Sequence, residues 1–201
     1  MSHKDDIISS IAVMIAIGKS RYTDMPYAKE IARHLYSFPD IYRPGIWFHA
    51  LKWMAGFSKN TIERVTSLEG KHLSTNEAIK NLGECIVFEI AAGLSTRGLE
   101  FTSTGNSLFI EGDLENIINA KKGIVERIRK EKGYDSNPYH VFMKFDASNP
   151  MDYLKIGGYL IAKGNDKPIA IVHEGLITHL SLDGQESFRD NIKYFLEKYS
   201  P

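Results

Sequence analysis

Four short apolar runs in the second half of the chain constrain its fold most strongly. Helical stretches separate these runs, which are CIVFEIA (85–91), SLFIEGD (107–113), HVFMKFD (140–146) and PIAIVHEG (168–175). Runs of this length, rich in β-branched and aromatic residues, are typical of strands buried on both faces, as in a parallel sheet. The alternation of strand and helix predicts right-handed βαβ units. We therefore expect an α/β, Rossmann-like protein whose sheet carries helices on both faces.

The first third of the chain predicts helices instead. Residues 5–18, 25–37, 45–56 and 73–82 have helix-like apolar spacing, and further helices are expected at 113–131, 150–160 and 184–199. Asp24 is a candidate N-cap, and Pro26 suits the first turn of the helix that would follow it. Ser74, three residues before Glu77, indicates another helix start. We therefore expect two regions in the chain: an N-terminal helical segment (1–82) that acts as a cap or lid, and a cofactor-binding core (83–201).

Composition narrows the function classes. The 25 basic and 25 acidic residues balance, which argues against bulk binding to nucleic acid or to an anionic membrane. Cys85 is the only cysteine, so a disulfide within the chain is excluded and a reduced, cytoplasmic compartment is expected. The apolar stretch 7–18 is too short to cross a bilayer. No metal site is expected, because four of the histidines lack metal-ligand spacing with carboxylates or with Cys85: His34, His49, His72 and His179.

An acidic residue lies near the end of each apolar run. In open α/β sheets, ligands bind beyond the carboxyl ends of the strands, and these ends share one edge. The residues concerned are Glu89, Glu111 with Asp113, Asp146, and Glu174. The pattern predicts a pocket that receives hydroxyl groups, amino groups or a positive charge.

A turn of small residues follows the first run. Gly93 would let a ligand approach the backbone, and the next helix would aim its N–H groups at that ligand. Glu111, about 20 residues further on, is where a ribose diol would be held. The stretch Ala91-x-Gly93-x-x-Thr96 is an incomplete G-x-G-x-x-G, which disfavours pyrophosphate and a nicotinamide-dependent oxidoreductase. A nucleoside without phosphates, such as S-adenosylmethionine, fits better; the alternative is a plain strand-to-helix turn whose glycine serves packing.

Several blocks of sequence resemble one family. EIAAGLSTRGLEF (89–101) looks like the first motif of the leucine carboxyl methyltransferase-like O-methyltransferases, and FIEGDLENIINAKKGIVERI (109–128) is similar to the second. IAIVHEGLITHLSLDGQESFRDNIKYF (169–195) resembles the family's "EGL" segment, and SSIAVMIAIGKSRYTDMPYAKEIA (9–32) its N-terminal segment. The blocks follow the family's order and cover most of the chain.

The resemblance implies a class I methyltransferase fold and transfer of the sulfonium methyl of S-adenosylmethionine to a small-molecule hydroxyl or carboxylate. Catalysis would come from in-line positioning and exclusion of water, and a carboxylate acceptor would need no general base. The implied cofactor residues are Gly93 and the backbone around Ala91 at the methionine part, Glu111 or Asp113 at the ribose, Asp146 near the adenine amino group and Glu174 at the amino-acid end. Glu89 is predicted as a further cofactor-binding residue. Lys19, Arg21, Arg64 or Lys71 would meet the cofactor carboxylate.

Three departures from the family pattern matter. Ala91 replaces a glycine, and Ser95 replaces an aspartate. The sequence also ends after the helix that follows the fourth run, where family members continue into further strands. We therefore expect a fragment or a reduced form, whose fourth strand would be an edge that a homo-oligomer could cover. The alternative function is a non-catalytic or regulatory Rossmann-like protein with a vestigial or binding-only nucleoside pocket.

Some side chains keep two interpretations. Arg97 would clamp a carboxylate or pair with Glu100 or Glu111. His173 would be a general base or a hydrogen-bonded structural residue. The second role is the more common one for a histidine near a strand end. The aromatic segment 46–57 would pack as a helix on the sheet or form a wall of the acceptor pocket.

Overall fold

A computed structural model describes residues 3–38, 59–104, 107–164 and 166–200. The predicted helix 45–56 and the aromatic segment 46–57 lie outside these ranges. The elements in chain order are α1 (His3–Tyr22), α2 (Ala28–His34), η1 (Leu35–Ser37), α4 (Lys59–Asn81), β1 (Ile86–Ile90), α5 (Arg97–Thr104), β2 (Phe109–Asp113), α6 (Glu115–Glu131), β3 (His140–Lys144), α7 (Pro150–Ala162), β4 (Ile169–His173), η2 (Ile177–His179) and α8 (Leu182–Tyr199).

The four strands form one parallel sheet, which confirms the predicted α/β architecture. Their order is β3-β2-β1-β4, so the chain adds strands on one side of β1 and then returns to the other. The order therefore changes direction between β1 and β4. In open α/β sheets such a switch point is where loops diverge and leave room for a ligand.

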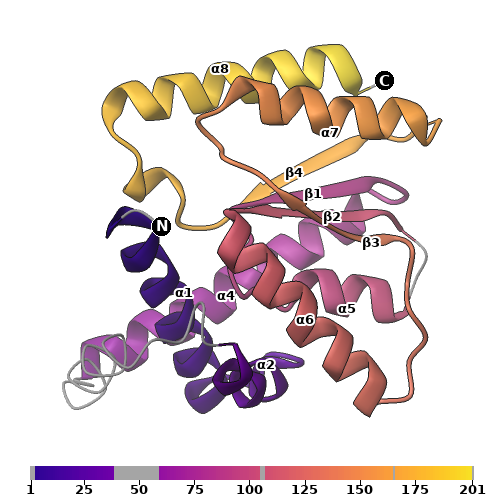
Figure 1. The fold of residues 1–201 in the computed structure, drawn as a ribbon. Coiled ribbons are helices and arrows are strands. Elements are labelled where there is room, and N and C mark those ends of the chain that lie inside the picture. The colour runs from indigo at the N-terminus through magenta and orange to yellow at the C-terminus, as the bar shows by residue number, and fades with distance from the viewer. Residues whose placement is uncertain (1–2, 39–58, 105–106, 165, 201) are drawn as a thin grey trace.

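Helices cover both faces of this sheet, as predicted. Figure 1 shows α7 and α8 on one face, with α4, α5 and α6 on the other and α1 and α2 beyond them. Successive side chains of β1 point to opposite faces: Phe88 packs with Tyr153 and Phe195 of the α7–α8 layer, whereas Val87 packs with Ile79 of α4. Each layer thus has its own apolar core, and the sheet separates the two.

The two outer strands differ from the prediction. We expected all four runs to be buried on both faces, but only β1 and β2 are buried along their whole length. β3 and β4 contain half-buried residues because each has a strand neighbour on one side only in the described sheet. The predicted homo-oligomer that would cover β4 stays a prediction.

Two predicted helix starts are wrong. α4 is continuous from Lys59 to Asn81, so Ser74 lies inside it and donates its hydroxyl to Lys71 O at 3.1 Å. α2 begins at Ala28, after Tyr27 in a left-handed conformation (φ 61°). Asp24 is not the N-cap, and its backbone N–H donates to Glu69 of α4 at 3.1 Å.

None of the described helices combines the length and the apolar character that a membrane span requires.

Candidate functional site

Two cavities lie side by side at the carboxyl edge of the sheet. The first, of about 200 Å³, lies between α1 and the segments that follow β1 and β4. The second, of about 410 Å³, lies between the ends of β2 and β3 and the start of α8. Four residues line both cavities: Ala91, Asp113, Leu176 and His179. The cavities are therefore neighbours around the switch point.

The predicted site residues distribute unevenly over these cavities. Five of the seven line the first cavity: Glu89, Ala91, Gly93, Asp113 and Glu174. Asp146 lines the second cavity, and its Oδ1 accepts hydrogen bonds from Ser148 N–H (2.9 Å) and from the Ser148 hydroxyl (2.7 Å). Glu111 lines neither cavity.

The turn after β1 explains the small residues seen in the sequence. Both Ala91 (φ 53°) and Gly93 (φ 50°) adopt left-handed backbone conformations. Such a conformation is rare for alanine and free of steric cost for glycine. A side chain at Gly93 would meet only an ordinary contact with Ala12, at 3.9 Å. The backbone conformation, rather than crowding, therefore requires glycine here.

Asp113, at the end of β2, stabilises this turn. Its Oδ2 accepts the Gly93 N–H at 2.6 Å, and its Oδ1 accepts the Leu114 N–H at 2.7 Å. The residue is 6% exposed, and burial raises the pKa of its carboxyl group to about 6 although both hydrogen bonds oppose the rise. A carboxylate has about four acceptor positions, so two remain for further donors on the wall shared by both cavities.

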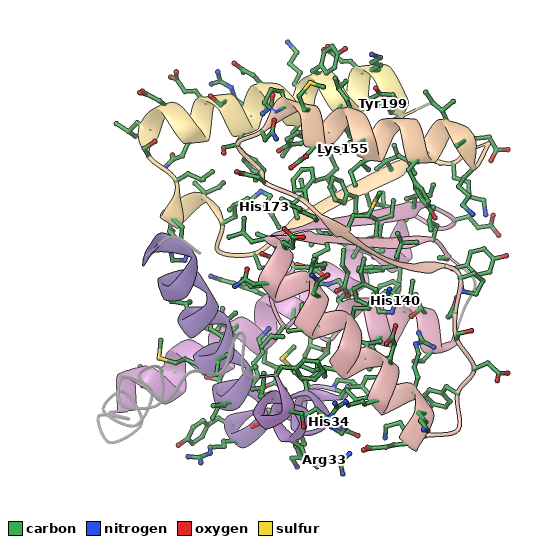
Figure 2. All side chains as sticks on the ribbon, viewed as in Figure 1. Arg33, His34, His140, Lys155, His173 and Tyr199 are labelled. Atoms are coloured by element: carbon green, nitrogen blue, oxygen red, sulfur yellow. The ribbon has the colours of Figure 1, made fainter. Side chains whose placement is uncertain are left out.

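Glu111 belongs to the interior rather than to the cavities. Lys121 Nζ lies 2.5 Å from its Oε2, and His140 Nε2 lies 3.1 Å from its Oε1. Burial alone would raise the pKa of Glu111, but Lys121 and His140 hold it below the usual range. Figure 2 shows His140 on the side of the sheet that α5 and α6 cover. A ribose held by Glu111, as predicted from the sequence, does not fit these contacts.

Arg97 links three elements beneath the switch point. Its guanidinium is fully buried and forms ion pairs with Glu89 of β1 and with Glu174 after β4. It also donates from Nε to Asn76 Oδ1 of α4 at 2.7 Å, and its Nη2 lies 3.2 Å from His72 Nδ1. Burial raises the pKa of Glu89. The carboxylates of Glu89 and Glu174 therefore stabilise the fold as well as lining the cavity.

Lys19 is the basic residue that lines the first cavity. It is 6% exposed, and burial lowers the pKa of its amine, although Glu174 and Glu89 attract it. Within the described ranges its Nζ has no hydrogen-bond partner and no ion pair. Arg21 and Lys71 are exposed and lie outside both linings, and the side chain of Arg64 is not among the described ones. A buried, unpaired cation favours an anionic group in the cavity.

Two further contributions to the cavity were missed in the sequence. Ile11, Ala12 and Ile15 of α1 line it together with Lys19, which the sequence had named. The spacing of four residues between Ile11, Ile15 and Lys19 indicates a shared helix face but not what that face packs against. His179, on η2, lines both cavities, and nothing in its sequence context indicated this.

His173, weighed as a general base, lies in neither lining. Its ring packs edge-on against Phe188 with centroids 5.2 Å apart, and burial lowers the pKa of the imidazole. Its Nδ1 is buried without a hydrogen-bond partner among the described residues. Figure 2 shows His173 at the end of β4 on the side of α7 and α8. The geometry therefore favours packing over proton transfer.

Neither a metal centre nor a known relative identifies the site. The described residues contain no group of three histidine, cysteine, aspartate or glutamate side chains that could hold a metal ion. The chain matches no model of a protein family, and no curated protein is significantly similar to it in sequence. The fold and the site define a Rossmann-like α/β protein with a paired cavity at its switch point.

Proposed function

We propose that this protein is an S-adenosylmethionine-dependent O-methyltransferase that acts on a small-molecule hydroxyl or carboxylate. One observation carries the proposal: Asp113, at the carboxyl end of the second strand, presents a carboxylate on the wall between two adjoining cavities. A ribose has two vicinal hydroxyl donors, and the free acceptor positions of a carboxylate match them. This residue takes the role that the sequence assigned first to Glu111.

The other lining residues fit the remaining parts of the cofactor. Lys19 would receive the carboxylate of the methionine part in the first cavity, and Asp146 lies on the wall of the second cavity, where an adenine amino group needs an acceptor. When bound, the cofactor supplies an electrophilic methyl group. The residues of this chain would orient it and keep water out, and the α1 wall serves both purposes.

The acceptor class depends on whether a base is available. A carboxylate acceptor needs only a positive charge and correct positioning. A hydroxyl acceptor also loses a proton, and His179 on the wall of both cavities is placed to accept one.

A second candidate function is a protein that binds the nucleoside without turning it over. It is favoured by the contacts of the strand-end carboxylates, because Arg97 engages Glu89 and Glu174, and Lys121 engages Glu111. Three acids that the sequence assigned to the cofactor thus hold the fold together, which leaves fewer groups for catalysis.

Calorimetry tests the proposed ligand. We expect the full chain to bind S-adenosylmethionine and its demethylated product but not NAD. Lys19→Met should lower the affinity for S-adenosylmethionine and for its demethylated product by about tenfold or more, because a charge-assisted hydrogen bond to the amino-acid part is lost. The affinity for adenosine should not change. Lys71→Met, an exposed control, should change neither.

Transfer of a labelled methyl group to a panel of hydroxy and carboxylic acids then separates an enzyme from a binder. Binding without transfer would favour the second candidate. Failure of S-adenosylmethionine, its demethylated product and adenosine to bind would reject both candidate functions.

A further inference from the structure

A second buried cation without an ion pair among the described residues lies far from the switch point. Arg129, near the end of α6, is 7% exposed, and its Nη2 donates to Thr102 Oγ1 of α5 at 2.6 Å. Among the residues that the structure describes, no carboxylate forms an ion pair with it. A guanidinium has five N–H donors, so most of them have no acceptor among the described residues. Buried charges in proteins are normally paired, which makes this arrangement unusual.

Arg129 also lines a cavity of about 410 Å³. The rest of the lining comes from Ser103 and from residues 133–139, which immediately precede β3. Because these residues lead into the strand, the cavity lies at the amino edge of the sheet, opposite the paired cavities. It is a separate site, with no lining residue in common with either of them.

Hydroxyl groups contribute to the lining around the guanidinium. They belong to Tyr134 and Ser136 of the loop and to Ser103, whose hydroxyl donates to Leu99 O at 2.6 Å. Burial lowers the pKa of Arg129, and the nearby phenols of Tyr27 and Tyr134 oppose this only in part. Asp135 also lines the cavity, but it is exposed and makes no ion pair with Arg129 in the described structure.

The loop that forms the cavity is anchored by its own hydrogen bonds. Asn137 Nδ2 donates to Thr102 O at 2.6 Å and Asn137 Oδ1 accepts the Tyr139 N–H at 2.8 Å, while the Tyr134 N–H donates to Arg129 O at 2.8 Å. The hydroxyl groups are therefore presented on a fixed frame, which reduces the ordering that a ligand would have to impose.

We propose that this cavity binds a phosphate group, free or carried on a small molecule, with Arg129 as its counter-charge. A planar guanidinium fork with the hydroxyl groups of Tyr134 and Ser136 on the same lining matches the oxygens of a tetrahedral oxyanion, which can accept several hydrogen bonds at once. The bound anion supplies the partner that Arg129 lacks within the described structure. The proposal is independent of the methyl-transfer function, because the two sites share no residue.

Titration calorimetry of the full chain tests this site. Inorganic phosphate should bind in a 1:1 ratio and raise the melting temperature above that in chloride of equal ionic strength. Arg129→Gln should lower the affinity for phosphate at least tenfold. Arg127→Gln removes the same charge from an exposed position on the same helix and should weaken it less than twofold. A phosphomonoester such as glycerol phosphate, tested in parallel, shows whether the site accepts a carried phosphate or only the free ion.

A milder variant covers the case in which Arg129→Gln does not fold. Tyr134→Phe removes one hydroxyl from a residue that is 42% exposed, and we expect a folded protein with phosphate affinity reduced two- to fivefold. The proposal is overturned if phosphate stabilises the wild type no more than chloride does, or if Arg127→Gln weakens binding as much as Arg129→Gln. Unchanged affinity in both Arg129→Gln and Tyr134→Phe would overturn it as well.

Discussion

Hydrogen bonding and burial have opposite effects on the ionisation of Asp113. Two backbone N–H groups stabilise its carboxylate, while burial favours the neutral acid and raises its pKa to about 6. The shift is upward, so this group binds its proton more tightly in the folded than in the unfolded chain. Its contribution to stability therefore increases as the pH falls from about 6 towards the usual value of 3.8.

The ionised form is the one that accepts two ribose hydroxyls, so binding and stability respond to pH in opposite directions. We expect the affinity for adenosine, which does not titrate in this range, to fall about tenfold between pH 7.5 and pH 5, since most Asp113 carboxyls are then protonated. Calorimetry at several pH values measures this. Asp113→Asn should bind weakly at every pH, and Asp183→Asn, an exposed control, should follow the wild type. A pH-independent wild-type affinity would exclude Asp113 as the ribose ligand.

Arg97 makes the strongest prediction about stability. Arg97→Met would remove the guanidinium that pairs with both Glu89 and Glu174, and removing one partner of a buried ion pair costs about 3–5 kcal/mol. Urea unfolding measures the loss. Arg189→Met, whose pair with Asp190 is exposed, should cost less than about 0.5 kcal/mol.

A second substitution tests the cause of that loss. Adding Glu89→Gln to Arg97→Met removes one uncompensated charge and should recover part of the stability, because residues in one network couple. If the double variant is less stable than Arg97→Met alone, charge repulsion is not the cause.

At the level of elements, the sequence predicts the strands and the helices after them well. All four strands lie within the predicted runs, because short apolar runs between amphipathic helices are a strong local signal. The start of α4 was wrong because Ser74 makes its hydrogen bond inside a helix that continues through it. A capping pattern is short, and the burial of His72 and Asn76 against Arg97 outweighs it.

The assignment of Glu111 failed for a different reason. Glu111 and Asp113 are two residues apart on one strand, so they point to the same face but lie about 7 Å apart along it. At this spacing Glu111 lies in the interior, whereas Asp113 lines the cavities at the end of the strand. The partners of Glu111, namely Lys121 and His140, come from the next helix and the next strand. Such contacts between elements cannot be read from a single run of residues.

Helix α7 offers a matched pair of glycines. A methyl group at Gly157 would collide with the ring of Tyr199 on α8, which Figure 2 shows beside α7, whereas one at Gly158 has nothing within 4 Å. Gly158→Ala should stabilise the protein by about 0.5–1 kcal/mol through helix propensity. Gly157→Ala should destabilise it by roughly 1–2 kcal/mol because the ring must move. Thermal and urea unfolding compare the two. Equal effects would mean that α7 and α8 do not pack through this contact.

At the scale of the whole molecule, the first cavity at the carboxyl edge of the sheet is lined by regions that are far apart in the sequence. Ile11, Ile15 and Lys19 of α1 face the turn at Gly93 and the segment that begins at Glu174. The predicted division into a cap (1–82) and a core (83–201) stays a prediction, but the cavity lies between parts of both ranges. The sequence indicated the residues on the core side through their position at strand ends. It could not indicate which face of α1 would lie opposite them, because that depends on how the helix packs.

This arrangement predicts how a ligand changes the dynamics of the molecule. A ligand that contacts α1 and the sheet together must suppress the local opening that separates them, because every such opening would break its contacts. Hydrogen exchange with saturating demethylated cofactor should therefore slow in α1, in residues 91–95 and in residues 174–176. Residues 133–139, at the opposite edge of the sheet, should not change. Protection of 91–95 without protection of α1 would show that the ligand binds the sheet edge alone and that α1 is no part of its site.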